Sequence, residues 1–145
     1  MKRNMLLLAS LVLSIAPSTA APGLKDRKDD DKARIVGNWK QEALCMRGGR
    51  MDTERTGSFR FGSDGSCGIS SGGGKENGAL YTLDPSTTPR RMKWLNGPEK
   101  TEWQCLYELD GDTLKVAFVD HGTDAPKKIE PAPNLTIYYL KRMKE

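Results

Sequence analysis

The chain has 145 residues, with 23 Lys and Arg against 19 Asp and Glu and a formal net charge of +4. This length suffices for one domain with a modest core rather than for two. Without Lys2 and Arg3, which lie in a segment expected to be removed, the charge is about +2, too small to indicate a nucleic-acid-binding protein.

Residues 1–20 have the three-part pattern of a secretory signal peptide. Lys2 and Arg3 give a basic start, residues 5–16 are an apolar run, and small residues precede Ala20. The run is shorter than a bilayer-spanning helix needs. We therefore expect cleavage after Ala20, a secreted or periplasmic location and no membrane insertion after cleavage; an uncleaved N-terminal anchor is the alternative.

Residues 21–33 are dense in charges of both signs and almost without large apolar side chains, which predicts a flexible charged linker. The aspartates at positions 29–31 lack the spacing of a calcium-binding loop, so we expect no metal there. Residues 34–145 are then expected to form a single folded domain.

Short extended segments and turn residues alternate through residues 34–145. The clearest pair is residues 101–119, where Trp103, Tyr107 and Phe118 fall on one side of a hairpin that turns at Gly111. No stretch has a sustained helical period. The expected strands are 35–46, 58–61, 66–70, 79–83, 91–95, 101–109, 113–119 and 135–142.

These eight segments, with turn chemistry between them, predict an all-β fold: an antiparallel eight-stranded barrel. Closure of the sheet removes the edges that otherwise invite aggregation. Alternation along the strands points a set of aromatic side chains into the barrel. The candidate interior and ligand-binding residues are Phe59, Phe61, Tyr81, Trp94, Trp103, Tyr107 and Phe118.

The start of the first strand, Gly37-Asn38-Trp39, resembles the Gly-x-Trp signature of lipocalins and the wider calycin group. A closer resemblance, over residues 35–145, is to an uncharacterised lipocalin-like (calycin) domain family of planctomycete type. It is carried by GNWK, YTLDPSTTPRRMKW, YELDGDTLKVAF and YYLKRMKE. The resemblance implies a lipocalin-like barrel, an exported protein and no established activity. It also implies that Arg142, after the last strand, packs over Trp39 at the closed end of the barrel through a cation–π contact.

Residues that could carry catalysis are few. Cys45, Cys67 and Cys105 form no CxxC pair, and His121 is the only histidine, so a structural zinc site is not expected. Which cysteines would pair in an oxidising compartment stays open. Without a Gly-x-Ser-x-Gly elbow, and with His121 in a polar loop, we expect no catalytic residue, no cofactor and no enzymatic activity.

Two functions follow from the aromatic interior. An eight-stranded barrel can hold one small ligand, and here a pocket would open at the end away from Trp39 and take a small apolar or aromatic molecule. Alternatively, side chains fill the barrel, and the protein is a structural or protein-interaction domain of the cell envelope with no small-molecule ligand. The protein partner in that case is not indicated by the sequence.

Overall fold

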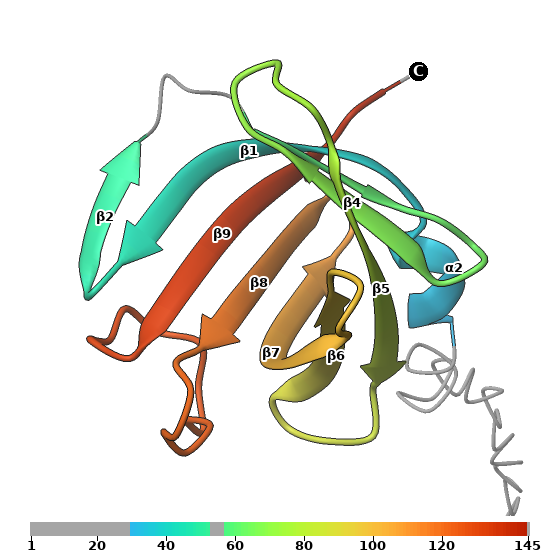
Figure 1. Cartoon of the computed structure of the whole chain (residues 1–145). Coiled ribbons are helices and arrows are strands. Elements are labelled where there is room, and N and C mark those ends of the chain that lie inside the picture. Colours follow the sequence, from blue (N-terminus) through green and yellow to red (C-terminus); the bar gives the residue numbers. More distant parts are fainter. Residues whose placement is uncertain (1–29, 53–56, 145) are drawn as a thin grey trace, which may run out of the picture.

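The strands of this protein form one antiparallel sheet that closes on itself (Figure 1). The computed structural model describes residues 30–52 and 57–144. Its elements are α2 (Asp31–Ile35), β1 (Gly37–Met46), β2 (Gly49–Asp52), β3 (Ser58–Phe61), β4 (Ser66–Ser70), β5 (Asn77–Asp84), β6 (Arg90–Asn96), β7 (Thr101–Asp110), β8 (Thr113–Val119) and β9 (Leu135–Arg142).

Closure comes from β1, which pairs with two strands that are far apart in sequence. Residues 37–40 of β1 pair with β3, and residues 39–46 pair with β9 on the other edge. From β3 to β9 each strand pairs with the next, so β1 and β3–β9 make a closed eight-stranded barrel. The predicted fold class is therefore confirmed. The extra strand β2, which was not among the expected strands, pairs with the far half of β1.

The segment before the barrel is folded, which corrects the expected extent of the linker. Residues 31–33 were assigned to the linker of residues 21–33, but they lie in the helix α2. Residues 21–29 of that linker and the expected signal peptide lie outside the described residues. A single helical turn is not stable alone. Asp31 and Ile35, four residues apart on one face, are both fully buried, so contacts with the barrel hold the turn.

A β-bulge divides β1 into two halves. The pairing register with β9 shifts between Gln41 and Ala43, so Glu42 is an extra residue in this strand. Because strand side chains alternate, one inserted residue exchanges the two faces. Trp39, before the bulge, belongs to the inner core, whereas Cys45, after it, belongs to a core on the outer face.

The outer core covers one side of the barrel wall. The connection between β8 and β9 crosses the outer surface there and contributes Ile129, while Ala132 packs against its edge. Parts of β7, β8 and β9, around Leu106, Ala117 and Ile137, are thus buried on both faces. The buried members of the outer core are Cys45, Leu106, Ala117, Val119, Ile129, Leu135 and Ile137.

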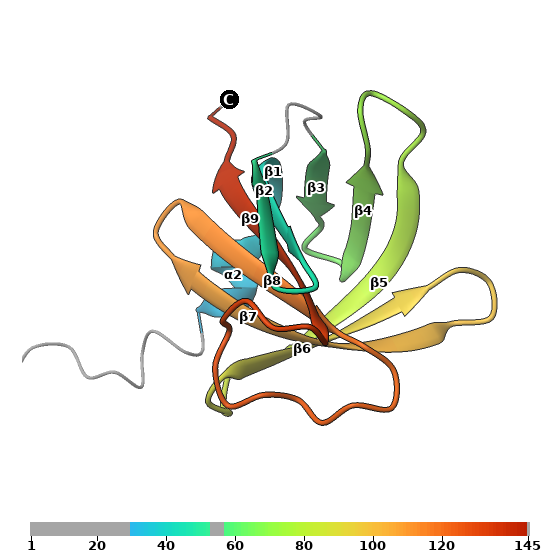
Figure 2. The ribbon, with the colours of Figure 1, turned by 90° about the vertical axis from the view of Figure 1, so that its left-hand side faces the viewer.

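The two ends of the barrel differ. The helix α2 lies at the end where β1 begins and β9 ends, as seen at the right of Figure 1. In Figure 2 the left-hand side of Figure 1 faces the viewer, so the strands lie in front and α2 lies behind them. We call the α2 end the closed end and the other end the mouth. No helix within residues 30–52 and 57–144 is long and apolar enough to cross a membrane.

Candidate functional site

Arg142 and Trp39 lie in contact at the closed end, where the resemblance placed them. The guanidinium carbon of Arg142 is 4.3 Å from the centroid of the Trp39 ring, and the two residues are directly opposite each other on β9 and β1. Arg142 also donates hydrogen bonds to the backbone oxygens of Val36, at 2.9 Å, and of Arg34. The indole nitrogen of Trp39 donates to the Ile35 oxygen at 2.8 Å. These bonds fix α2 to the barrel.

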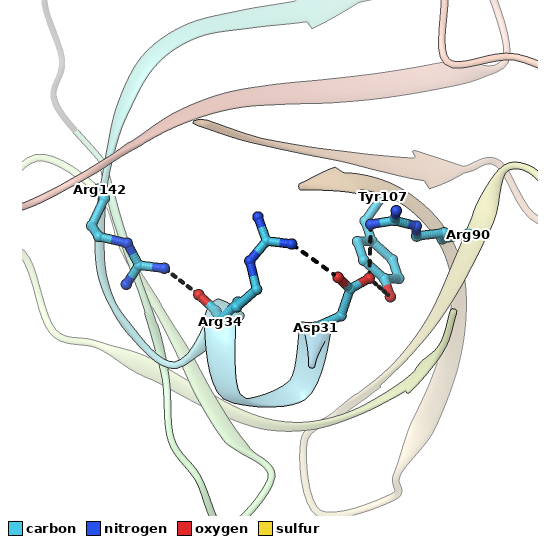
Figure 3. A network of polar contacts seen from close by, with 5 residues as sticks. All are labelled: Asp31, Arg34, Arg90, Tyr107 and Arg142. Carbon is cyan, nitrogen blue, oxygen red and sulfur yellow. Dashed lines mark hydrogen bonds and ion pairs between the residues drawn. The ribbon is translucent and has the colours of Figure 1, made fainter. Parts of the chain in front are cut away.

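A buried carboxylate completes the closed end (Figure 3). Asp31 is fully buried, and its Oδ2 accepts hydrogen bonds from Arg90 Nη1 at 2.8 Å and from the Tyr107 hydroxyl at 2.9 Å. Arg34 Nη1 lies 3.7 Å from Oδ1. Burial, and then the hydrogen bond to Asp31, raises the pKa of Tyr107. The sequence singled out Tyr107 as a ligand-binding candidate, but the structure engages its hydroxyl in this network.

The middle of the barrel is filled with rings. Phe59 and Phe61 are each 1 % exposed, and their centroids are 6.5 Å apart in a stacked arrangement. Tyr81 meets the edge of Phe61 at 5.1 Å and donates its hydroxyl to the Gly62 oxygen at 3.0 Å. Burial raises the pKa of Tyr81. Three of the candidate residues, Phe59, Phe61 and Tyr81, therefore pack the interior.

The mouth has two adjoining hollows. The aromatic hollow is about 300 Å³ and is lined by Met46, Ile69, Trp94, Asn96, Trp103, Phe118, Thr136 and Tyr138. The asparagine hollow is about 480 Å³ and is lined by Ile69, Asn77, Gly78, Trp94, Asn96 and Gly97. The structure thus brings three of the candidate residues, Trp94, Trp103 and Phe118, together at the mouth.

The rings of the aromatic hollow contact one another at their edges. Phe118 lies 5.6 Å from Trp94, 6.4 Å from Trp103 and 5.7 Å from Tyr138, measured between ring centroids. These are ordinary separations for edge-to-face aromatic pairs. His121, from the connection after β8, adds a ring 4.4 Å from Trp103. The hollow therefore offers several ring faces and edges to a flat ligand.

Five residues that line the aromatic hollow were not among the candidates from the sequence: Met46, Ile69, Asn96, Thr136 and Tyr138. Tyr138 stands beside Tyr139, so alternation alone does not say which of them points inward. The signal was available from Arg142, because Tyr138 lies four residues before it and therefore on the same face of β9. Met46 was missed because the bulge in β1 reverses its face. Thr136 lies on the face of Tyr138 and follows from the same reasoning.

The polar atoms of the aromatic side chains differ in their hydrogen bonding between the two ends of the barrel. In the closed end and the middle, the polar atoms of Trp39, Tyr81 and Tyr107 all have hydrogen-bond acceptors in the protein. At the mouth, the side-chain polar atoms of Trp94, Trp103 and Tyr138 bond to no other group in the described part of the chain. Burial nevertheless raises the pKa of Tyr138. The mouth thus combines apolar rings with available donors and acceptors.

None of the three cysteines lines the aromatic hollow at the mouth. All three are buried and unpaired. Burial raises the pKa of Cys67 to about 12 and also raises that of Cys105, which keeps both thiols protonated at neutral pH. Cys67 and Cys105 belong to the inner core, whereas Cys45 belongs to the outer core, on the other side of the barrel wall. In residues 30–52 and 57–144, no group of His, Cys, Asp and Glu is arranged to hold a metal.

Comparison of the chain with protein-family models, with curated proteins and with solved structures gives no match. The described residues offer a closed barrel, one end sealed by α2 and an opposite end lined with rings. The role of the protein has to be inferred from the chemistry of that open end.

Proposed function

We propose that this chain is an exported, lipocalin-like binding protein that takes a small apolar or aromatic ligand at the mouth of its barrel and performs no catalysis. The pattern of residues 1–20 supports export. The closed barrel and the Arg142–Trp39 contact support the lipocalin-like assignment. The observation that carries the binding role is the contrast between the ends, because aromatic polar atoms are bonded at the closed end and available at the mouth.

The ligand is expected at the mouth rather than deep in the barrel. Phe59, Phe61 and Tyr107 are at most 1 % exposed, so side chains occupy the interior below the mouth. The aromatic hollow, at about 300 Å³, is at the lower end of the volume range of small-molecule sites. Each ring that a flat ligand contacts there adds about 0.5–1.5 kcal/mol beyond the burial of apolar area. A ligand of one or two rings fits this geometry.

A catalytic role has little support from the thiols or from His121. Burial holds the pKa of Cys67 at about 12, which leaves almost no nucleophilic thiolate at neutral pH. The exposed ring of His121 lies against the ring of Trp103, 4.4 Å away between centroids. A binding role uses both arrangements without requiring a reaction.

Native mass spectrometry of the protein purified from its own host tests the proposal. A native mass that exceeds the denatured mass by a discrete small-molecule increment is the expected result. Equal masses, together with flat titrations of the protein with neutral aromatic compounds, would overturn the binding role. That outcome would favour the filled-barrel domain that acts through protein partners. The denatured mass also reports whether residues 1–20 are removed.

A pair of variants locates the ligand. Trp103→Ala removes a ring of the aromatic hollow and is expected to weaken ligand binding at least tenfold. Leu80→Ala removes an exposed apolar side chain, 46 % exposed, that does not line the hollow. It should leave affinity unchanged. Equal losses in the two variants would contradict binding at the mouth.

A further inference from the structure

The two hollows of the mouth form one two-part site. They share Ile69, Trp94 and Asn96, so a single molecule can occupy both. The aromatic hollow presents mainly rings and aliphatic groups. The asparagine hollow presents the side chains of Asn77 and Asn96 beside the glycine backbone at Gly78 and Gly97. One part of the site thus suits an apolar ring, and the other suits a hydrogen-bonding group.

The two asparagines are placed to act together. Asn96 on β6 is opposite Ala79 on β5, and Asn77 is two residues from Ala79. Asn77 and Asn96 are therefore diagonal neighbours on the same face of adjacent strands, a separation of about 7–8 Å that one polar group can bridge. In the described part of the chain, neither side-chain amide is hydrogen-bonded to another protein group. Each amide has two donors and an acceptor to offer.

The lining of both hollows is uncharged. Among the described residues, no Lys, Arg, Asp or Glu lines the aromatic hollow or the asparagine hollow. A charged ligand would lose water there without gaining an opposite charge, which is unfavourable. A neutral group that both donates and accepts, such as a carboxamide or hydroxyl, matches the two amides.

We infer that the ligand is a neutral, flat aromatic molecule that carries a carboxamide or hydroxyl group. Its ring lies in the aromatic hollow against Trp103 and Phe118, and its polar group bonds to Asn77 and Asn96. This inference rests on the proposed function and adds the chemical class of the ligand and the residues that select it.

Three probes that share the naphthalene ring test the inference: naphthalene, 2-naphthamide and 2-naphthoate. Each is titrated into the protein, and its affinity is measured by calorimetry. The expected order places 2-naphthamide about tenfold tighter than naphthalene, as one or two added hydrogen bonds allow. The anionic 2-naphthoate is expected to bind more weakly than 2-naphthamide by at least the same factor. Equal affinity for all three probes would overturn the inference and leave the proposed function standing. No binding of any probe would overturn the inference, and together with equal native and denatured masses it would overturn both.

Asparagine variants assign the selectivity. Asn77→Leu and Asn96→Leu are each expected to remove most of the preference for 2-naphthamide and to leave the affinity for naphthalene within about twofold. Asn38→Leu is the matched control, since Asn38 is an exposed strand asparagine at the closed end. A preference for 2-naphthamide that survives in the Asn77→Leu/Asn96→Leu double variant would overturn the assignment of these residues. Circular dichroism verifies that each variant remains folded.

Discussion

The guanidinium of Arg142 lies 4.3 Å from the ring centroid of Trp39 and also donates to the backbone of Val36, so one side chain joins β9, β1 and the end of α2. Replacing it with alanine removes a cation–π contact and charge-assisted hydrogen bonds. We expect Arg142→Ala to lower the free energy of unfolding by about 2–4 kcal/mol in urea denaturation. Lys141→Ala, at the exposed neighbouring position, should change it by less than about 0.5 kcal/mol. Similar losses in the two variants would contradict this role.

Gly37 is required by its backbone conformation and by Arg142. Its φ is +131°, and a Cβ atom there would lie 2.9 Å from Arg142 Nη1. We expect Gly37→Ala to lower the free energy of unfolding by about 1–3 kcal/mol, from backbone strain and displacement of the guanidinium. Gly78→Ala is the control, because a Cβ atom at Gly78 meets nothing within 4 Å. If urea denaturation shows Gly37→Ala to be as stable as Gly78→Ala, the close approach to Arg142 does not constrain this position.

The buried carboxylate of Asp31 joins α2 to two strands of the barrel, to β6 through Arg90 and to β7 through Tyr107. Asp31→Ala leaves Arg90 without its partner and the Tyr107 hydroxyl without its acceptor. We expect a loss of about 3–5 kcal/mol in the free energy of unfolding, as for other broken buried ion pairs. Glu108→Gln breaks the exposed pair with Lys115 and should cost at most about 1 kcal/mol. A loss in Asp31→Ala no larger than that in Glu108→Gln would show that α2 contributes little to stability.

The buried thiols predict a loss of stability in alkaline solution. The ordinary thiol pKa is 9.0, and burial raises that of Cys67 to about 12 and raises that of Cys105 as well. Above pH 9 the unfolded chain loses these protons while the folded chain retains them. The free energy of unfolding therefore falls as pH rises from about 9 towards 12, with each thiol contributing up to about 1.4 kcal/mol per pH unit.

Urea denaturation across this pH range, under reducing conditions, measures the effect. The Cys67→Ala/Cys105→Ala variant should be less stable than the wild type at pH 7, because two buried side chains are shortened. Its stability should then decline less steeply with pH. Parallel declines in the two proteins would show that these thiols do not carry the alkaline loss.

The alternation of apolar and polar residues along short segments, with turn residues between them, was sufficient to predict the barrel. The 101–119 hairpin turns at Gly111, and the last strand runs over Leu135–Arg142, as the pattern of apolar residues indicated. These segments have one or both faces buried by side chains within the same sheet. Local periodicity therefore carries most of the information that specifies them. The division of the candidate rings into interior and mouth was not visible, because it depends on how far along each strand a residue lies.

Features that depend on tertiary contacts were not predictable from local pattern. α2 is one charged turn, and it is stabilised by contacts with the barrel, among them those with Arg90, Tyr107 and Arg142. The outer core had a readable signal in the continuous apolar run of residues 116–119, since strands buried on both faces lose their alternation. The position of the connection that covers this core had no such signal.

Because of the bulge at Glu42, the two halves of β1 contribute side chains to different parts of the molecule. Before it, the strand supplies Trp39 to the sealed floor; after it, the strand turns Met46 to the mouth and Cys45 to the outer core. Methionine is unbranched and adaptable, so this part of the lining can change its shape more readily than a branched or aromatic side chain could. If the same residues paired with β9 without a bulge, the alternation set by Trp39 would point Cys45 rather than Met46 to the mouth. A single inserted residue in the strand that closes the barrel thus decides which side chain of β1 lines the aromatic hollow.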